Sequence, residues 1–334
     1  MSGVLDLAAQ NLLSPMILCF ALGLGAALAR SDLSVPEAVA KGMSLYLLFA
    51  IGFKGGVAVS AHGAGLDLVL ALVAGVVLSA MLPFAAYGLL RRMTGLSAVD
   101  AAAVAAHYGS ISIVTFVTAT AILTAQGIAY EGYLVAVAAA MEAPAILSAL
   151  WLVARRAGAG SDSDGARAAT TGNTPLREIL LNGSIVLLIG AFVIGWITGA
   201  PGLAQIDAFI TAPFSGVLCL FLLDMGLIAG RGLRRARQVL SPGTLAFGIL
   251  MPLVGATAGL VVGAALGLSA GGVAVLMTLC ASASYIAVPA AMRVALPEAD
   301  PAIYLTLSLG VTFPFNLTIG LPLYIAVASA LLGG

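Results

Sequence analysis

The stretch AAHYGSISIVTF, residues 105–116, lies inside a long apolar run, and its Ser-Ile-Ser motif interrupts that run. A second stretch, CASASYIAVP, residues 280–289, places Ser-Ala-Ser inside another apolar run. At a constant offset of 172 residues the motifs align, Ser110 with Ser282, Ser112 with Ser284 and Gly109 with Ala281. This recurrence predicts an internal repeat with one interrupted helix in each half.

Composition predicts a membrane protein. Of the 334 residues, 61% are hydrophobic and 8% are charged, and the mean hydropathy is +1.13. A soluble domain of this length needs far more charge to cover its surface. Apolar runs of roughly 20 residues, enough to span hydrocarbon as a helix, recur along the chain. We predict an all-α polytopic membrane protein, and we find no basic face for nucleic acid.

Ten apolar segments are predicted to cross the lipid bilayer. They cover residues 11–29, 39–61, 68–90, 97–124, 130–154, 178–199, 206–230, 243–267, 270–295 and 302–332. The fourth and ninth segments contain the Ser-x-Ser motifs, and we predict that both are broken helices.

Basic residues predict the orientation. Thirteen of the 14 Lys and Arg residues lie in or beside odd-numbered loops, and none lies in an even-numbered loop or at a terminus. Positive charge accumulates on the cytoplasmic side of membrane proteins. We therefore expect both termini outside the cell (inner) membrane and the linker 157–176 in the cytoplasm. The remaining basic residue, Lys54, lies within a span and is expected to pair with Asp224.

The linker separates two predicted halves, 1–156 and 177–334, of five spans each. Because five is odd, the second half enters the membrane in the opposite sense, which predicts an inverted repeat of the kind found in transporters. A further match aligns AIGFKGG, residues 50–56, with DMGLIAG, residues 224–230, and pairs Gly52 with Gly226.

The two interruptions predict a site for a small anion. A broken helix leaves backbone groups without partners, which hydrocarbon penalises unless the break lines a site. Helix N-termini present N–H groups and partial positive charge, and serine hydroxyls add donors. The alternative is that these serines only allow close helix packing.

Glu142 predicts a cation site. It lies within a span, where ionisable residues are functional candidates, and Pro144 frees a backbone carbonyl one turn earlier. Carboxylate and carbonyl oxygens suit Na⁺, and Thr312 and Asn316 supply neutral oxygens around Pro314 in the other half. The alternative is a Glu142 that only packs two helices.

Four segments in order, LLFAIGFKGG, AHYGSISIVTF, IAYEGYLVAVAAAMEAPAIL and ASASYIAVPAAMR, resemble the sodium-dependent bicarbonate transporters of the SbtA type. The resemblance implies core and gate domains, a homotrimer, and Na⁺-coupled bicarbonate uptake by alternating access, with no cofactor besides the coupling ion. It also implies a PII-like regulatory partner at the cytoplasmic face. The bicarbonate-binding residues it implies are Gly109, Ser110, Ser112, Ser282, Ala283 and Ser284. The implied sodium ligands are Thr115, Glu142, Thr312 and Asn316.

Other functions remain open at this stage. A cation-coupled carrier of another small anion, such as a monocarboxylate, fits the same features. A channel is disfavoured because no selectivity-filter repeat is evident, and a receptor because alternating access explains the inverted repeat. We expect no enzyme, because no His-Glu-x-x-His pair or Gly-x-Ser-x-Gly motif is present.

Overall fold

The computed structural model describes residues 13, 15–62, 65–157, 183–239, 241–285, 288, 289, 292, 296 and 298–332. Within these residues, eight helices are long and apolar enough to cross a membrane, and two shorter apolar helices, Pro15–Leu28 and Ala270–Ala281, accompany them. The class predicted from composition, an all-α polytopic membrane protein, is therefore confirmed. Ten complete spans remain a prediction, since most residues before Pro15 and several between 286 and 297 lie outside the described part.

The helices follow one another in an order close to that predicted. Their bounds are α2 Pro15–Leu28, α3 Glu37–His62, α4 Leu66–Met93, α5 Ala98–Gly109, α6 Ile113–Ala125, α7 Leu134–Ala140, α8 Glu142–Ala157, α10 Gly183–Ile210, α11 Phe214–Val239, α12 Pro242–Ala265, α13 Ala270–Ala281 and α15 Pro301–Leu307. The C-terminal helix continues through a π-helical segment Ser308–Thr312, α16 Phe313–Phe315, a second π-helical segment Asn316–Gly320 and α17 Leu321–Leu332.

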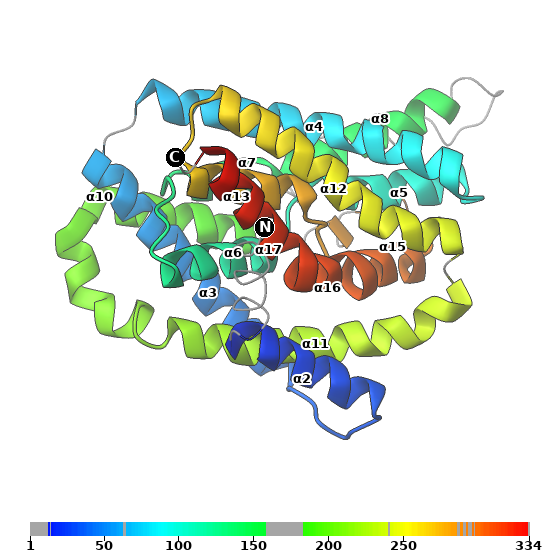
Figure 1. Ribbon diagram of the computed structural model, residues 1–334, viewed down its shortest axis with the longest axis horizontal. Coiled ribbons are helices and arrows are strands. Elements are labelled where there is room, and N and C mark those ends of the chain that lie inside the picture. The colour runs from blue at the N-terminus through cyan, green and yellow to red at the C-terminus, as the bar shows by residue number, and fades with distance from the viewer. Residues whose placement is uncertain are drawn as a thin grey trace.

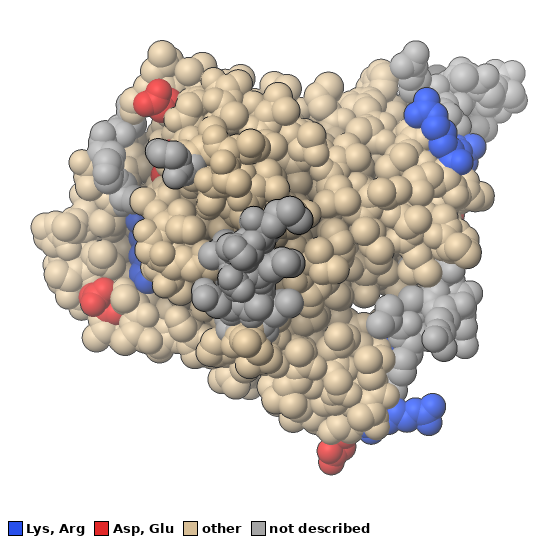
Figure 2. Space-filling view, in the orientation of Figure 1, with Lys and Arg blue, Asp and Glu red and all other residues tan. Residues whose placement is uncertain are grey.

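The short helices lie between longer ones. In Figure 1, α4 and α12 run along one side of the bundle, and α11 with α2 runs along the opposite side. The helices α5, α6, α13 and α15–α17 lie between them. On the face shown in Figure 2, charged side chains lie toward the sides and the lower edge, and the centre of that face carries none among the residues coloured there. Large apolar side chains such as Ile197 and Leu66 are exposed, as expected for a surface that faces lipid.

Two helix crossings bring backbones into direct contact. On α2 and α11, a Cβ atom added to Gly23 would overlap the carbonyl oxygen of Leu223, and one added to Gly226 would overlap that of Phe20. Only glycine allows helices to approach so closely, as is common in membrane bundles. The contacts advance in the same direction along both chains, from Phe20 with Gly226 to Ala27 with Gly230, so these helices are parallel.

The second crossing, between α3 and α10, uses the same arrangement. A Cβ atom on Gly195 would overlap the carbonyl oxygen of Phe53, and one on Gly56 would overlap that of Phe192. The two crossings match position by position: Gly23 with Gly195, Phe20 with Phe192, Leu223 with Phe53 and Gly226 with Gly56. The sequence comparison paired Gly226 with Gly52, which is wrong by one helical turn. Sequence letters alone did not distinguish Gly52 from Gly56, whereas the backbone contact does.

The seventh predicted span, 206–230, has the wrong boundaries. The helix α10 kinks at Gly199, whose φ is 57°, and then continues to Ile210. A turn at residues 211–213 follows, and α11 then runs to Val239. A short apolar helix after the kink was therefore assigned to the wrong span. The basic residues of the predicted seventh loop belong to an extension of α11.

Lys54 does not form the predicted pair with Asp224 among the described side chains. Its Nζ lies 5.0 Å from the ring centroid of Phe214, and its electrostatic partner is Asp207. Asp224 interacts instead with Arg231, two turns along its own helix. The register that equates Gly56 with Gly226 also equates Lys54 with Asp224, but equivalent positions lie at different crossings, α3 with α10 and α11 with α2, so equivalence does not bring the two charges together.

The glycine crossing predicts a stability difference between two positions on α11. Gly226→Ala places a methyl group against the Phe20 carbonyl, and we expect a loss of about 1–3 kcal/mol, typical of overpacking. Gly216→Ala is the matched control, because an added Cβ there meets no atom within 4 Å. Thermal unfolding of detergent-purified protein measures both. Equal melting temperatures for the two variants would contradict the crossing.

Candidate functional site

Both predicted helix breaks are present. The helix α5 ends at Gly109 and α6 begins at Ile113, so Ser110, Ile111 and Ser112 are not helical. In the other half, α13 ends at Ala281 and residues 282–284 are extended or irregular. The breaks therefore fall at the serine motifs that the sequence singled out.

The two breaks are hydrogen-bonded to each other in the interior. The N–H of Ser112 donates to Ser282 Oγ at 2.9 Å. The N–H of Ser284 donates to the carbonyl oxygen of His107 at 2.8 Å. All four residues are buried. In each half, the interruption leaves a backbone N–H without a helical acceptor. That N–H finds its acceptor in the other half.

The first serine of each motif donates its hydroxyl proton to another group of the protein. Ser282 Oγ, besides accepting from the other break, donates its proton to the Leu279 carbonyl at 2.9 Å. Ser110 Oγ donates to Glu142 Oε2 at 2.7 Å. Neither hydroxyl proton is available to a ligand, so these two serines support the site in a different way from the second pair.

The second serine of each motif accepts hydrogen bonds but donates none to another described residue. Ser112 Oγ accepts from the N–H and the hydroxyl of Thr115, at 3.2 and 2.9 Å. Ser284 Oγ accepts from the N–H of Val288 at 3.5 Å. Among the described residues, neither hydroxyl has an acceptor for its own proton. Both can therefore donate to a bound anion.

The N-terminus of α6 adds backbone donors beside Ser112. The first-turn N–H groups of Ile113 and Val114 have no intrahelical acceptor, and no other partner is found for them in the part of the chain described. The helix dipole adds partial positive charge at this end. Two hydroxyl protons and two backbone N–H groups thus suit a small oxyanion.

Two tyrosines flank the breaks and differ in their hydrogen bonds. The sequence favours packing for both, and Tyr108 agrees, because its hydroxyl bonds to Thr312 Oγ1 at 2.5 Å. Tyr285, the residue after Ser284, has a buried hydroxyl that lies against the Ser112 side chain. No hydrogen bond of good geometry satisfies that hydroxyl within the described structure. Sequence reasoning missed this donor, since only the fold brings it to the other break.

Gly109 is required by the approach of α4. An added Cβ would come within 2.5 Å of Pro83 Cδ and within 2.7 Å of the Ser79 carbonyl oxygen. Pro83 has no N–H, so it also frees that carbonyl from its helical hydrogen bond. The Ser79 hydroxyl donates to the Met141 carbonyl at 2.5 Å, directly before Glu142. The helix α4 thus connects the first break to the acidic residue.

The four predicted sodium ligands are all buried but lie in separate contacts. Glu142 contacts Ser110, and Thr115 contacts Ser112. No hydrogen bond joins any two of the four predicted ligands among the residues the structure describes. Through these contacts Glu142 and Thr115 both lie beside the first break.

In the C-terminal helix, Thr312 ends the first π-helical segment and Asn316 begins the second. Thr312 Oγ1 donates to the Gly248 carbonyl at 2.7 Å, an oxygen that Pro252 leaves without a helical donor. Asn316 Nδ2 donates to the Ala281 carbonyl at 2.9 Å, at the edge of the second break. Each oxygen also accepts a tyrosine hydroxyl, Thr312 Oγ1 from Tyr108 and Asn316 Oδ1 from Tyr324, so one lone pair is left on each.

His107 is a buried histidine with a defined tautomer. Its Nδ1 lies 2.6 Å from the Ala103 carbonyl oxygen and must carry a proton to donate there. Its ring stacks on Tyr304 with centroids 4.6 Å apart. Nε2 is therefore an acceptor, and no donor reaches it within the described residues.

These features define a class: a polytopic helical membrane protein with the architecture of a transporter, in which interrupted helices meet at buried polar groups. The sequence profile of the Na⁺-dependent bicarbonate transporter superfamily matches residues 15–329. Because the match covers nearly the whole chain, the protein belongs to this superfamily, and the resemblance read from four segments is confirmed. No curated protein matches the chain. Membership of a transporter superfamily supports the prediction that the protein is not an enzyme.

The different hydrogen bonds of Ser282 and Ser284 predict different effects of their substitution on stability. Ser282→Ala leaves the Ser112 N–H without an acceptor and removes a bond to Leu279, so we expect a loss of about 1–3 kcal/mol. Ser284→Ala removes a hydroxyl whose proton is unused, so we expect a much smaller loss. Thermal unfolding without bicarbonate distinguishes the two. A larger effect of Ser284→Ala would contradict the assignment.

Proposed function

We propose that the protein is a secondary active transporter that couples Na⁺ entry to bicarbonate uptake into the cytoplasm by alternating access. Superfamily membership supports bicarbonate and Na⁺ as the transported ions. The observation that carries the mechanism is the contact between the two breaks. The hydrogen bond from Ser112 N–H to Ser282 Oγ, 2.9 Å long, joins the two breaks. The hydroxyl protons of Ser112 and Ser284, one from each break, can be donated to a ligand.

The chain is built, on this proposal, from two inverted five-helix repeats. The matched crossings support it. Exchanging the halves replaces α2 with α10 and α3 with α11, so the crossing of α2 with α11 becomes the crossing of α10 with α3. These four helices form the gate domain, and the remaining helices form the core domain that contains both breaks. Motion of one domain against the other exposes the site to each side in turn.

Bicarbonate binds between the breaks. Ser112 and Ser284 donate their hydroxyl protons to its oxygens, and the N–H groups at the start of α6 stabilise its charge. The Tyr285 hydroxyl supplies a further donor beside Ser112. The other predicted bicarbonate-binding residues support the site without donating hydrogen bonds to the anion. They are Gly109, Ser110, Ser282 and Ala283.

Na⁺ binds at the Glu142 carboxylate beside the first break, with oxygens such as that of Thr115 as neutral ligands. The hydrogen bond between Ser110 and Glu142 places this negative charge next to the anion site. Without Na⁺ the carboxylate repels an anion, whereas bound Na⁺ attracts it. Opposite unit charges 4 Å apart attract by about 4 kcal/mol at an effective dielectric constant of about 20. This attraction couples the two ions.

Other expectations remain predictions. The homotrimer, the PII-like partner and the orientation with both termini outside follow from resemblance or from charge distribution. A monocarboxylate or another small anion is the alternative substrate, because the same donors bind any small oxyanion.

Transport by reconstituted protein tests the function. We expect uptake of radiolabelled bicarbonate into liposomes only with an inward Na⁺ gradient, and a loss of tenfold or more in Ser112→Ala and in Glu142→Ala. A tenfold loss corresponds to about 1.4 kcal/mol, close to one charge-assisted hydrogen bond. Thr257→Ala is the matched control, since its exposed hydroxyl bonds only within α12. Uptake by folded wild type without Na⁺ dependence would refute the coupling, and uptake of acetate alone would refute the substrate.

Removal of single tyrosine hydroxyls tests the anion site. Tyr285→Phe deletes an unpartnered donor, so we expect the KM for bicarbonate to rise about 2- to 10-fold, equivalent to about 0.5–1.5 kcal/mol, with little change in melting temperature. Tyr108→Phe deletes the bond to Thr312, so we expect a lower melting temperature with KM nearly unchanged. Uptake kinetics and thermal unfolding of both variants measure these effects. An unchanged KM in Tyr285→Phe would remove this residue from the site.

A further inference from the structure

The carboxylate of Glu131 binds the start of a helix in the other half of the chain. Glu131 lies in the segment between α6 and α7, and Ser269 is the N-cap residue of α13. The N–H of Ser269 donates to Glu131 Oε1 at 2.7 Å, and the Ser269 hydroxyl lies 3.1 Å from Oε2. The same hydroxyl accepts from the N–H of Gly272 at 3.1 Å. Neither proposed ion site includes Glu131.

The equivalent helix of the first half carries its own carboxylate. At the offset of 172 residues, Ser97 matches Ser269 and Asp100 matches Gly272. The hydroxyl of Ser97, the N-cap residue of α5, donates to Asp100 Oδ2 at 2.6 Å and accepts from the Asp100 N–H at 3.0 Å. An acidic residue three positions after an N-cap serine is the pattern of a capping box. Glu131 thus supplies from another segment the carboxylate that α13 lacks in its own first turn.

Two glycines make room for the segment that contains Glu131. A Cβ atom added to Gly272 would overlap Glu131 Oε2, so the carboxylate lies where a side chain at position 272 would begin. A Cβ atom added to Gly271 would overlap the carbonyl oxygen of Ala129. The first turn of α13 therefore fits against residues 129–131 because it reads Ser-Ala-Gly-Gly, where α5 has Ser-Ala-Val-Asp.

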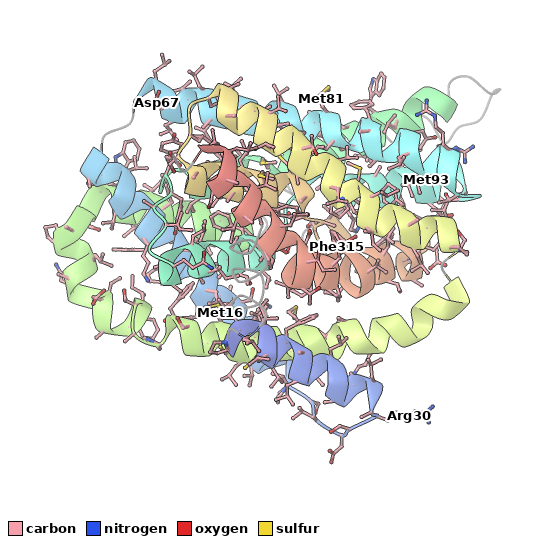
Figure 3. All side chains as sticks on the ribbon, in the orientation of Figure 1. Met16, Arg30, Asp67, Met81, Met93 and Phe315 are labelled. Atoms are coloured by element: carbon pink, nitrogen blue, oxygen red, sulfur yellow. The ribbon has the colours of Figure 1, made fainter. Side chains whose placement is uncertain are left out.

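The contact lies at the end of the bundle opposite to Met93. A Cβ atom added to Gly243, at the start of α12, would overlap the Met93 carbonyl oxygen, whereas one added to Gly263 would touch Val273, near the start of α13. These two glycines are roughly 30 Å apart along the helix. Figure 3 shows Met93 and Asp67 at opposite ends of α4. The charge distribution predicts that the Asp67 end faces outward.

Three helices run from this contact to the proposed ion sites. The helix α6 begins directly after Ser112, α7 ends just before Glu142, and α13 ends directly before the second break. The helix α13 packs against both α6 and α7. Because the Glu131 segment joins α6 to α7, its hydrogen bonds to α13 connect three helices whose other ends carry Ser112, Glu142 and Ser284.

The opposite end of the core domain has a matching contact between the halves. The N–H of Asp300, the N-cap residue of α15, donates to Asp100 Oδ1 at 2.9 Å. The start of α5 is thus bound to the segment before α15, as the start of α13 is bound to the segment before α7. In the proposed repeat α5 corresponds to α13 and α7 to α15, so the two contacts join equivalent places.

We propose that Glu131 is a positioning residue for transport, a role that rests on the proposed function. Its carboxylate fixes the start of α13 to the segment between α6 and α7. Ser112, Glu142 and Ser284 therefore keep their relative positions as the core domain moves. Glu131 acts through these helices and contacts neither ion.

Moving the carboxylate from one segment to the other tests the capping contact. Glu131→Ala should lower the melting temperature by about 2–4 °C, as expected for the loss of a helix cap. Gly272→Asp alone should lower it too, because its side chain would overlap the Glu131 carboxylate. The double variant Glu131→Ala/Gly272→Asp copies Ser97 and Asp100, so it should be more stable than either single variant. A double variant no more stable than both would overturn the capping role.

The double variant separates positioning from capping, because it caps α13 without joining it to the segment between α6 and α7. In Na⁺-driven liposome uptake we expect its KM for bicarbonate to rise about 2- to 10-fold, with the maximal rate nearly unchanged. Glu298→Ala is the matched control, since Glu298 is exposed and hydrogen-bonds to no other described residue. A wild-type KM in the double variant would overturn the proposal, because the cap alone would then suffice.

Hydrogen exchange tests the positions of the breaks without any transport. The N–H groups of Ser112 and Ser284 are hydrogen-bonded between the breaks, so peptides that contain them should exchange slowly in the wild type. In the double variant we expect faster exchange in these peptides, whereas the first turn of α13 stays protected. Unchanged exchange would overturn the role of Glu131 even if the wild type transports bicarbonate. Faster exchange, with no uptake by the wild type, would support the positioning of the breaks and refute the proposed function.

Discussion

Backbone N–H groups at two helix breaks have to be satisfied inside a bilayer that offers no water. The fold meets this requirement by placing the breaks against each other, so that Ser112 N–H finds Ser282 Oγ and Ser284 N–H finds the His107 carbonyl. Each unsatisfied group would cost several kcal/mol in hydrocarbon. The packing of α5, α6 and α13 therefore depends on this exchange. The polar interior is then available for ions without separate stabilisation.

Glycine and proline make this exchange sterically possible. Gly109 lets α4 approach the first break, and Gly255 lets α12 touch the Cys280 carbonyl at the second. Pro83 and Pro252 each free a carbonyl in those flanking helices. At Pro252 the freed Gly248 oxygen accepts the hydroxyl of Thr312. Residues that read as helix breakers in the sequence thus become sources of acceptors close to the breaks.

Much of the fold could be predicted from the sequence, because hydrocarbon imposes simple rules on length and polarity. The positions of both breaks followed from the recurrence of Ser-x-Ser, and the superfamily followed from four segments. The seventh span was misplaced because apolar residues after Gly199 form a short helix rather than the start of α11. The pairing of Gly52 with Gly226 failed because only backbone contact distinguishes glycines one turn apart. The role of Tyr285 required a contact between residues from opposite halves, which no local pattern encodes.

The motifs are symmetric in sequence, but their hydrogen bonds are not. Ser282 serves the backbone of the opposite break, whereas its counterpart Ser110 bonds to Glu142. When Pro144 is matched with Pro314, the position equivalent to Glu142 is Thr312, which has no carboxylate. The departure from symmetry thus falls on the residue proposed to bind Na⁺. In the proposed transport cycle, the inverted repeat supplies two equivalent ways to open, and a charged side chain in one half alone makes the empty and sodium-bound proteins differ. On this argument, the Ser110–Glu142 bond is where cation binding and anion binding influence each other.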